Sequence, residues 1–495
     1  MRVTLTPAAF GGTLAAPPSK SMAHRALICA ALAQGESRVC GISSSEDMRA
    51  TMRAMAALGA QLIPDTAQSG CVRVRGVAAQ GEVGSGQTVA PECVRGVAAA
   101  HAPATPQASV RPIYTPNSTA QAALFAPVTA PVDCGESGST LRFLLPLFSL
   151  TGAPATLTGH GRLPQRPQTV YEALFAAHGC SFLQNGTGIT VNGALPAGEY
   201  VIDGSVSSQF ISGLLFALPL LQGDSVVRIT PPFESRSYVD LTVRALADFG
   251  ITVTWQGQNT ICISGSQKYI PCHYTVEGDY SQAAFFAVAA AAGALRSTSG
   301  FACAAATPTL TLTNLRADSL QGDRVIFDLL TRCGAPVARG VAAAAAAGGT
   351  DAVTIAAGAP LCGVDIDLAD CPDLGPILMV LGLFCKGETV IRNAGRLRIK
   401  ESDRIAAMEC EIRKLGGQIE SVGDTVRVRK SALHACAALN SHGDHRIVMA
   451  LCAAALAAGI SVTIDGAQAV NKSYPRFFED LAALGAKVEK YDEAT

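Results

Sequence analysis

The stretch Pro17-Pro18-Ser19-Lys20-Ser21-Met22-Ala23-His24-Arg25 runs directly into an apolar segment. This pattern predicts a loop that starts a helix, because two prolines end the preceding segment and Ser19 or Ser21 can cap the first turn. Lys20 and Arg25 lie in or next to that turn, where a cation opposes the helix dipole. Free amides and fixed cations at a helix start indicate a phosphate or carboxylate site. The alternative is a solvated basic helix end, which the apolar remainder of the helix disfavours.

The composition limits the possible partners. The chain has 495 residues and a net charge of -1, with 49% hydrophobic, 16% charged and 5% aromatic residues. The length allows two or more domains, and the charge and aromatic content disfavour nucleic-acid binding. The apolar runs 210–221 and 447–460 are shorter than the roughly 20 residues that span a bilayer, and the first residues lack a signal-peptide pattern. We therefore expect a cytoplasmic monomer without nucleic-acid or membrane partners.

The sixteen cysteines are scattered, and no pair has C-x-x-C spacing. Most lie in apolar segments such as 27–31 and 450–454, which predicts buried reduced thiols rather than disulfides or a zinc site. The sequence contains no G-x-x-x-x-G-K-[ST] phosphate loop, no G-x-G-x-x-G at a helix start and no clustered His/Cys set. This argues against nucleotide hydrolysis, nicotinamide binding and metallohydrolase chemistry, and we expect neither a cofactor nor a metal.

The opening pattern, a polar turn that leads into an apolar helix, occurs six times. The six turns begin at Ser19, Glu136, Ser207, Asp279, Pro372 and Asp444. Each of these inner helices is apolar nearly all round and is expected to be buried. A strand, a loop and a second, amphipathic helix follow each one. The second helices end at Gly59, Gly179, Gly250, Gly334, Gly416 and Gly485, which predicts left-handed caps that lead into strands. Six βα-type repeats predict an α/β fold with two lobes of three repeats each.

Three repeats are longer than the others. The shortest spacings between the helix-ending glycines are 69 and 71 residues, and the excess lies in the Ala-rich segments 84–131, 301–308 and 340–349. We expect these segments to be surface additions at loop or hairpin tips. The predicted domains are residues 1–18 with 276–495, and residues 19–275, which contain the low-complexity insertion 84–131.

Charged side chains gather at the starts of the inner helices and in the loops before the second helices. The densest run, residues 396–404, holds six charges in nine residues. Such a run is usually a solvated face, but Arg404 opposes the dipole of the helix that it opens. We therefore favour a functional interpretation. If the repeats are related by symmetry, these charges line a basic cleft, and many cations with few carboxylates suit a reaction between phosphorylated or carboxylated small molecules.

Ten segments resemble those of the 5-enolpyruvylshikimate-3-phosphate synthase family. They are PPSKSMAHR (17–25), GESGSTLRF (135–143), LPQRP (163–167), DGSVSSQF (203–210), ESRSYVD (234–240), VEGDYSQAAFF (276–286), CPDLGP (371–376), RIKESDR (398–404), GDHRIVMA (443–450) and NKSYPRFFEDL (471–481). The resemblance implies two lobes that close over the substrates, with the N-terminal segment in the C-terminal lobe. It also implies transfer of the enolpyruvyl group of phosphoenolpyruvate to the 5-hydroxyl of shikimate 3-phosphate, with release of phosphate, in aromatic amino acid biosynthesis.

The resemblance also implies site residues. Those for phosphoenolpyruvate are Lys20, Gly138, Arg166, Gln209, Arg404, His445, Arg446 and Lys472. Those for shikimate 3-phosphate are Lys20, Ser21, Arg25, Ser207, Ser208, Gln209, Ser235, Tyr238, Asp373 and Lys400. Glu401 is expected to protonate the methylene carbon, and Asp373, assisted by Lys20, to remove the hydroxyl proton. Neighbouring cations should lower the pKa of Glu401, so closure and desolvation would have to raise it again.

Two departures and two alternatives accompany this interpretation. Glu136 begins a Glu-Ser-Gly segment where many relatives have Asn-Ala-Gly, which could alter the affinity for phosphoenolpyruvate and glyphosate. Arg396 replaces an Asn of some relatives, so we expect no substrate contact from it. A UDP-N-acetylglucosamine enolpyruvyl transferase would carry a reactive cysteine in the loop 159–164, which has none. A non-catalytic anion-binding scaffold would not explain why Lys20 and the two carboxylates at 373 and 401 are all present.

Overall fold

The computed structural model describes residues 1–77, 123–295, 308–341, 351–356 and 358–491. The chain divides into two compact units, each treated by itself below. Unit 1 comprises Met1–Lys20, Ser43–Glu46 and Glu277–Thr495, and unit 2 comprises Ser21–Ile42 and Asp47–Val276. The sequence prediction set the divisions after residues 18 and 275 and did not anticipate that 43–46 would join unit 1.

The elements of the first three repeats form unit 2, apart from the first residue of α1 and of α2. In order they are α1 (Lys20–Leu32), β3 (Glu36–Cys40), α2 (Glu46–Ala57), β4 (Gln61–Pro64), β5 (Cys71–Arg75), β6 (Val132–Asp133), α3 (Gly138–Ser149), β7 (Ala155–Thr158), α4 (Thr169–Ala177), β8 (Ser181–Gln184), β9 (Gly188–Asn192), β10 (Glu199–Asp203), α5 (Ser208–Ala217), β11 (Ser225–Thr230), α6 (Arg236–Asp248), β12 (Val253–Gln256), β13 (Thr260–Ile263) and β14 (His273–Thr275). Their sheets have the strand orders β14-β3-β5-β4, β6-β7-β9-β8 and β10-β11-β13-β12.

Unit 1 contains the two N-terminal strands and the last three repeats. Its elements are β1 (Arg2–Thr6), β2 (Gly12–Ala15), α7 (Tyr280–Ala289), β15 (Thr309–Leu315), α8 (Ile326–Arg332), β16 (Val337–Val341), β17 (Asp351–Ala356), β18 (Asp365–Asp367), α9 (Gly375–Gly382), β19 (Glu388–Arg392), α10 (Arg404–Lys414), β20 (Gln418–Val422), β21 (Thr425–Arg429), β22 (Leu439–Asn440), α11 (His445–Ala458), β23 (Val462–Asp465), α12 (Phe477–Ala483) and β24 (Lys487–Tyr491). Its sheets have the orders β16-β17-β15-β2, β18-β19-β21-β20 and β22-β23-β1-β24.

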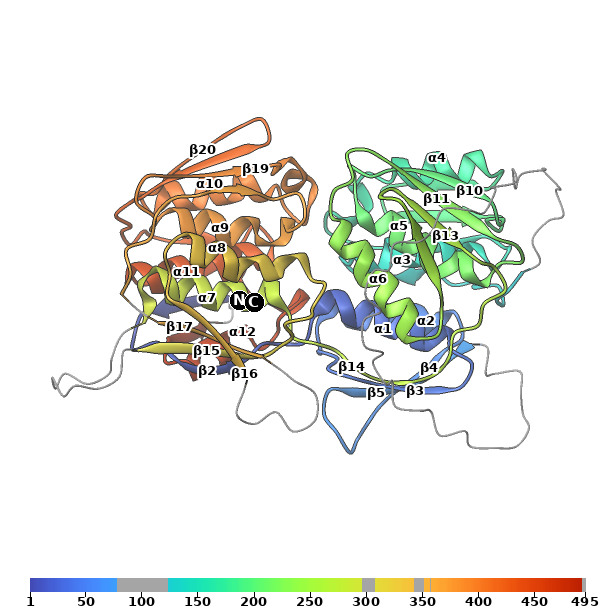
Figure 1. Cartoon of the computed structure of the whole chain (residues 1–495), viewed down its shortest axis with the longest axis horizontal. Coiled ribbons are helices and arrows are strands. Elements are labelled where there is room, and N and C mark those ends of the chain that lie inside the picture. Colours follow the sequence, from blue (N-terminus) through green and yellow to red (C-terminus); the bar gives the residue numbers. More distant parts are fainter. Residues whose placement is uncertain (78–122, 296–307, 342–350, 357, 492–495) are drawn as a thin grey trace. The chain divides into compact units, whose positions relative to one another are not determined.

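All six sheets share one topology. Each sheet has one parallel pair of strands, and its remaining pairs are antiparallel. A parallel pair needs a crossover connection. In four sheets the inner helix provides it, as α5 does between β10 and β11, whereas the parallel pairs β14–β3 and β2–β15 join segments that are far apart in the sequence. In the last repeat β1 lies between β23 and β24, and β2 pairs with β15. Figure 1 shows β2 beside β15. These pairings place the N-terminal segment with the C-terminal half, and the predicted fold of six repeats, three in each unit, is confirmed.

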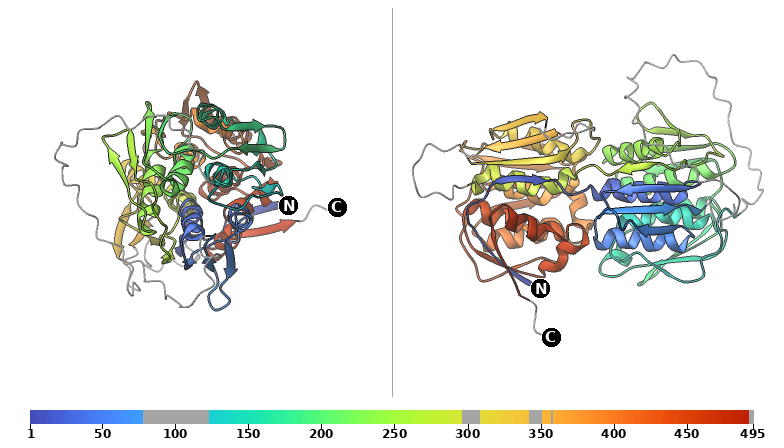
Figure 2. Two further views of the ribbon diagram at one scale, coloured as in Figure 1. Left: turned by 90° about the vertical axis from the view of Figure 1, so that its right-hand side faces the viewer. Right: turned by 90° about the horizontal axis from the view of Figure 1, so that it is seen from below.

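The inner helices are buried, as their composition predicts. Every residue of α7 and of α9 is buried, whereas α6 buries only one face, which includes Val239, Leu241 and Leu246. Figure 2 shows helices of each unit enclosed by its sheets. The six glycines that end the second helices have φ between +71° and +113°. This is the left-handed region that glycine enters without a steric penalty, so the predicted caps are confirmed.

One cysteine prediction is wrong. Cys40 of β3 and Cys71 of β5 are register partners in an antiparallel pair and form a disulfide. The two cysteines are 31 positions apart in the sequence, with α2 and β4 between them, so their spacing did not indicate that they pair. Among the other described cysteines twelve are free and eight of these are buried, as expected.

The predicted insertions fall largely outside the described residues, which omit 78–122, 296–307 and 342–350. Their described borders place the first between β5 and β6, the second before β15, and the third in the β16–β17 hairpin. Within the described ranges no helix has both the length and the apolarity that a membrane crossing requires.

Candidate functional site

Three carboxylates stand where the inner helices of unit 1 begin. Asp279 Oδ1 accepts a hydrogen bond from a backbone N–H of the first turn of α7 at 3.1 Å. Asp444 Oδ1 accepts one from the N–H of Arg446 in α11 at 2.9 Å. Asp373 lies in the 3-10 turn directly before α9. Carboxylates suit these positions because they accept hydrogen bonds from free amides and complement the helix dipole.

Arg446 connects Asp373 to helix α7. Its Nη2 donates to Asp373 Oδ2 at 2.7 Å and to Ser281 Oγ at 3.1 Å, and its Nη1 donates to the Asp373 carbonyl at 3.0 Å. Ser281 Oγ in turn donates to Asp279 Oδ1 at 2.7 Å. A guanidinium that is 3% exposed needs such partners, because an unpaired charge inside a protein is costly.

Arg404 opens α10 and binds three carboxylates. Its Nε donates to Asp444 Oδ2 at 2.8 Å, its Nη2 to Glu401 Oε2 at 2.8 Å, and its Nη1 to Asp373 Oδ1 at 3.4 Å. The arginine side chain is 1% exposed. A cation at a helix start opposes the dipole, and the three carboxylates compensate for it here. The structure therefore brings together Asp373, Glu401, Arg404 and Arg446, as the sequence predicts.

Neighbouring cations keep Asp373 ionised. Burial alone raises the pKa of its carboxyl group, but Arg446, Lys400 and Arg404 lower it, and the net pKa is well below the ordinary value. Burial lowers the pKa of Lys400 to about 8, although Asp373 partly opposes this shift. Lys400 Nζ lies 3.9 Å from Asp373 Oδ1. At neutral pH an ionised carboxylate therefore faces an ammonium group with a lowered pKa.

Lys20, His445 and Lys472 also belong to unit 1. The backbone N–H of Lys20 donates to Asp279 Oδ2 at 3.1 Å, and the charge of Lys20 acts on both Asp373 and His445. His445 is 1% exposed, and burial lowers its pKa to about 3, so it is a neutral imidazole. Lys472 is buried at the end of the 3-10 helix Ala467–Lys472. We name one group of residues the unit 1 cluster: Lys20, Asp373, Lys400, Glu401, Arg404, Asp444, His445 and Arg446.

In unit 2, Arg25 is a buried cation between α1 and α6. Its Nη2 donates to the Tyr238 carbonyl at 2.7 Å, its Nε to Thr242 Oγ1 at 2.8 Å, and its Nη1 to the Ser21 carbonyl at 2.7 Å. Burial lowers its pKa to about 10, which still leaves it charged. In the part of unit 2 that the structure describes, no carboxylate pairs with this guanidinium. An anionic ligand would supply the missing charge.

Gln209 connects α5 with α3. Its Oε1 accepts a hydrogen bond from Arg142 Nη1 at 2.9 Å, and its Nε2 donates to Ser139 Oγ at 3.0 Å. Arg142 also donates to Gln168 Oε1 at 3.2 Å and to the Pro167 carbonyl at 3.0 Å. The amide of Gln209 is thereby held in one orientation, because its oxygen faces a guanidinium and its nitrogen a hydroxyl.

Gly138 and Arg166 lie against each other beside Gln209. A Cβ added to Gly138 would lie 2.8 Å from Arg166 Nη1 and 3.6 Å from Gln209 Oε1. The missing side chain thus leaves room for a guanidinium that is 8% exposed. Three residues predicted to bind phosphoenolpyruvate therefore meet in unit 2.

The predicted serines lie at the starts of α5 and α6. Ser207 caps α5, and its Oγ accepts a hydrogen bond from the backbone N–H of Gln209 at 3.3 Å. Ser208 is the first residue of α5 and is 6% exposed. Ser235 precedes α6 with φ +56°, and its carbonyl accepts a hydrogen bond from the N–H of Tyr238 at 3.1 Å.

Sequence reasoning did not assign Asp279, Ser281, Asp444 and Arg142 to the site. Asp279 and Asp444 were visible as the first residues of their turns, a signal that indicates a helix cap. Ser281 and Arg142 follow two such turns, at helix starts where charged residues gather. All four residues lie at the start of an inner helix, and this position is the signal that could have identified them. Their hydrogen-bond partners are set by the packing of distant repeats.

The two departures from the family pattern have clear positions. A Cβ on Gly161 would collide with the Glu136 carboxylate, so Glu136 packs against the loop 159–164 that lacks a cysteine. Arg396 Nη2 donates to the Ala369 carbonyl at 2.6 Å, which engages this guanidinium with the backbone of the turn after β18.

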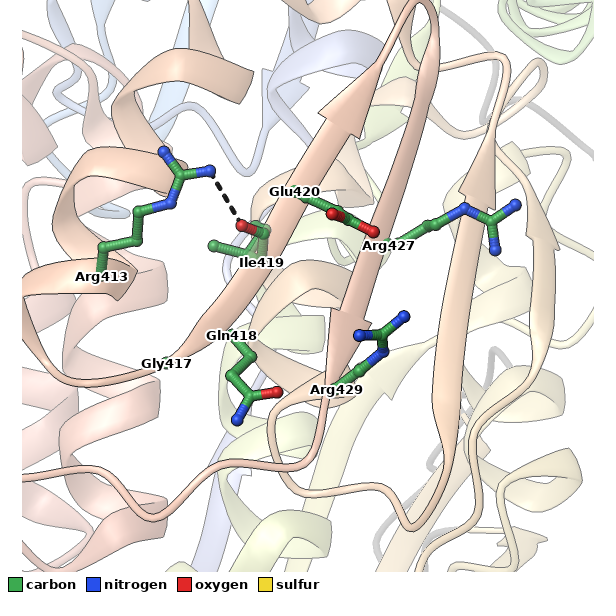
Figure 3. A pocket seen from close by; sticks show the side chains of 7 residues that line it. All are labelled: Arg413, Gly417, Gln418, Ile419, Glu420, Arg427 and Arg429. Carbon is green, nitrogen blue, oxygen red and sulfur yellow. Dashed lines mark hydrogen bonds between the residues drawn. The ribbon is translucent and has the colours of Figure 1, made fainter.

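A pocket of about 190 Å³ lies where α10 ends and the β20–β21 hairpin begins (Figure 3). Three of its lining residues are arginines, but each is engaged by the protein. Arg413 Nη2 donates to the Ile419 carbonyl at 3.0 Å, while Arg427 and Arg429 both pair with Glu388. Because these three arginines already bind protein groups, the pocket does not offer them to an anionic ligand.

The chain matches the family model described as EPSP synthase (3-phosphoshikimate 1-carboxyvinyltransferase) over residues 5–91 and 114–481. It is 35% identical over 492 residues to a 3-phosphoshikimate 1-carboxyvinyltransferase of Clostridium beijerinckii, covering 98% of each chain. It is also 35% identical over 493 residues to the protein of the same name from Clostridium acetobutylicum, covering 99% of this chain and 98% of that one.

Solved structures show the same fold. An EPSP synthase from Acinetobacter baumannii aligns with a TM-score of 0.71 at 24% identity, covering 99% of this chain and 100% of that one. The enolpyruvyl transferase NikO from Streptomyces tendae aligns with a TM-score of 0.69 at 18% identity, covering 99% and 98%. With the family match and the two Clostridium relatives, these findings establish that the chain belongs to the EPSP synthase (3-phosphoshikimate 1-carboxyvinyltransferase) family.

Proposed function

We propose that the protein transfers the enolpyruvyl group of phosphoenolpyruvate to the 5-hydroxyl of shikimate 3-phosphate and releases phosphate. The observation that carries this proposal is Asp373, which is held between Arg404 and Arg446 with Lys400 beside it. It combines an ionised carboxylate with cations suited to a carboxylate and a phosphate group. Family membership supplies the identity of the reaction, and the chain adds the residues that would perform it.

The two substrates would use different sets of side chains. The set for phosphoenolpyruvate is Lys20, Gly138, Arg166, Gln209, Arg404, His445, Arg446 and Lys472. The set for shikimate 3-phosphate is Lys20, Ser21, Arg25, Ser207, Ser208, Gln209, Ser235, Tyr238, Asp373 and Lys400. Planar guanidinium groups bind carboxylates and phosphates through paired hydrogen bonds, which fixes the orientation of the ligand. Among the described residues the hydrogen bonds of Arg25 all go to neutral oxygens, and this buried charge supports a role in holding the phosphate of shikimate 3-phosphate.

The proposed catalytic roles of Glu401 and Asp373 follow from the proton transfers that the reaction needs. The 5-hydroxyl oxygen adds to the phosphate-bearing carbon while Glu401 donates a proton to the methylene carbon. Asp373, assisted by Lys20, accepts the proton of the hydroxyl group. Because the transferred group keeps its carbon–carbon double bond, the Glu401 carboxylate takes a proton back from the new methyl group as the bond from carbon to the phosphate oxygen breaks and phosphate leaves. An ionised Asp373 suits proton acceptance, and the 2.8 Å contact of Glu401 with Arg404 fixes its direction.

We also propose that the enzyme works in the cytoplasm as a monomer without nucleic-acid or membrane partners. The near-neutral net charge supports the absence of nucleic-acid partners. The twelve free thiols among the described cysteines support a reducing compartment, in which the Cys40–Cys71 disulfide is an exception. UDP-N-acetylglucosamine is not favoured as the acceptor, because the relatives carry the shikimate name and the loop 159–164 has no cysteine.

Phosphate release by the purified protein tests the proposal. The protein is incubated with phosphoenolpyruvate and either shikimate 3-phosphate or UDP-N-acetylglucosamine. We expect release only with the first acceptor. Release only with the second would overturn the proposed acceptor, and no release from folded protein with either would overturn the proposed reaction.

A further inference from the structure

Three side chains of the kind that bind zinc lie near the C-terminal end of α10. Cys410 and Glu411 belong to this helix, and His442 follows β22. His442 Nε2 lies 2.8 Å from Glu411 Oε1. The ligand atoms of Cys410, Glu411 and His442 all lie within 4.8 Å of one another. None of these residues belongs to the unit 1 cluster or to the substrate sets.

Glu411 is the buried centre of this group. It is 0% exposed, and Lys414 Nζ donates to both of its carboxylate oxygens at 2.9 Å. The backbone N–H of Asn440 donates to its Oε2 at 3.0 Å. The protein thus holds this buried carboxylate directly beside an imidazole and a thiol.

We propose that Cys410, Glu411 and His442 bind a zinc-type divalent cation. Thiolate, imidazole and carboxylate are the ligands of tetrahedral zinc sites. At bond lengths of about 2.0–2.3 Å, the ligand atoms of a tetrahedron lie about 3.3–3.8 Å apart. The three ligand atoms are already within 4.8 Å of one another, so modest side-chain movements create this geometry.

In this structure the ammonium group of Lys414 lies beside Glu411, where the proposed cation would bind. Its side chain is 40% exposed on the last residue of α10, so its ammonium group can turn into solvent when a cation takes Glu411 Oε1. Glu411 Oε2 keeps the N–H of Asn440, an outer contact of the kind that orients metal ligands. Because a cysteine binds a metal as the thiolate, binding of a cation to Cys410 releases a proton.

The cation would cross-link α10 to the turn that precedes α11. Glu411 lies on α10, and His442 lies three residues before the first residue of α11. The same two helices carry Arg404 and Arg446 in their first turns. The expected role is structural, because the ligands do not belong to the unit 1 cluster. The sequence analysis expected no metal, and the 31 residues between Glu411 and His442 explain why spacing alone did not indicate this group.

Cobalt and zinc titrations of the full chain test the proposal. The protein is prepared without a histidine tag, treated with EDTA and desalted. We expect one equivalent of Co²⁺ to give a thiolate-to-metal charge-transfer band, and Zn²⁺ to displace it. Cys410→Ser and His442→Gln, which change partly exposed residues, should each weaken binding at least about 100-fold. Cys362→Ser changes an exposed cysteine outside the group and serves as the matched control.

Thermal unfolding provides a second readout that does not depend on turnover. One equivalent of Zn²⁺ should raise the Tm of the unaltered protein and of Cys362→Ser, but not that of Cys410→Ser or His442→Gln. The proposal is overturned if one equivalent of cobalt gives no charge-transfer band. It is also overturned if the band persists unchanged in both Cys410→Ser and His442→Gln.

Discussion

Arg404 Nε donates a 2.8 Å hydrogen bond to Asp444 Oδ2, and the two side chains are 1% and 0% exposed. This bond joins the first residue of α10 to the cap of α11. Because the same guanidinium contacts Glu401 and Asp373, a pair that stabilises the fold also orients the proposed catalytic carboxylates. Structure and chemistry are therefore coupled through one arginine.

Asp444→Asn should lower the free energy of unfolding of unit 1 by about 3–5 kcal/mol, because it removes one of the two carboxylates that contact the buried Arg404 at 2.8 Å. Denaturant unfolding measures the loss. Asp365→Asn is the matched control, since it removes the exposed partner of Arg392 at 2.7 Å and should change the midpoint little. Equal losses in the two variants would contradict the assigned role of the buried pair.

Glu401→Gln and Asp373→Asn should each lower kcat at least about 100-fold, because each removes a group that gives or accepts a proton. Steady-state phosphate release measures kcat, and circular dichroism confirms folding. Glu420→Gln, which alters an exposed carboxylate of β20, should keep full activity. Near-normal turnover in either site variant would remove that residue from its proposed role.

His445 should make stability depend on pH. Its folded pKa is lowered to about 3, whereas an unfolded histidine titrates near about 6.5. Between these values the unfolded chain binds more protons, so the stability from neutral His445 is present above pH ~6.5 and is lost as the pH falls. Protonation of His445 in the unfolded chain therefore lowers the free energy of unfolding by about 2 kcal/mol at pH 5 relative to neutral pH. Between pH 7.5 and 5, His445→Asn should therefore lose about 2 kcal/mol less than the unaltered protein. Identical pH dependence in the two would refute this.

Gly138→Ala should raise the KM for phosphoenolpyruvate and change stability little. The new Cβ would lie 2.8 Å from Arg166 Nη1, at the far end of a flexible side chain that can move away. The guanidinium would then leave its position beside Gln209. Gly186→Ala is a useful control, because a Cβ there meets nothing within 4 Å. An unchanged KM would show that Arg166 does not bind this substrate.

The repeats could be predicted because their signals are local. Each helix-ending glycine, such as Gly59 or Gly416, marks its own turn, and burial of each inner helix follows from its own composition. The partner of a charge is not local. Arg446 lies 73 residues from Asp373, and only the packing of two repeats joins them. The sequence therefore indicated most residues that the structure gathers in the unit 1 cluster, but not that Asp444 joins them.

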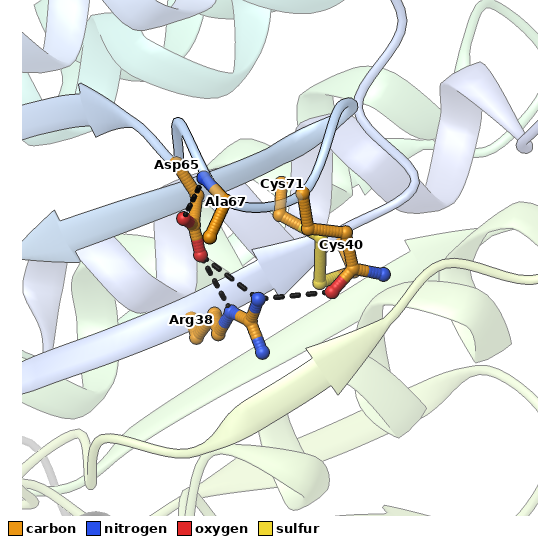
Figure 4. The surroundings of a disulfide bond; sticks show 6 residues. Arg38, Cys40, Asp65, Ala67 and Cys71 are labelled. Atoms are coloured by element: carbon orange, nitrogen blue, oxygen red, sulfur yellow. Dashed lines mark hydrogen bonds and ion pairs between the residues drawn. A yellow bond between two sulfur atoms is a disulfide. The ribbon is translucent and has the colours of Figure 1, made fainter.

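The disulfide was missed for the same physical reason. Cys40 and Cys71 meet through the register of β3 and β5, and Figure 4 shows the bond beside the Arg38–Asp65 pair. Strand register depends on which faces are buried across the whole sheet, so the cysteine spacing does not reveal it. Local composition correctly predicted most of the other cysteines as buried thiols, because burial follows from the apolar segments around them.

Replacing both Cys40 and Cys71 with serine should destabilise unit 2. Their cross-link closes a loop over a sequence separation of 31 residues, and chain entropy alone predicts a loss of about 4 kcal/mol. Urea unfolding measures this loss, and Cys362→Ser, at an exposed free cysteine, should leave the midpoint unchanged. Thiol titration of the denatured, unreduced protein should find two thiols fewer than after reduction, and the double variant should show no such difference. Equal counts before and after reduction would mean that the two cysteines are thiols in solution, and the double variant would then lose no cross-link.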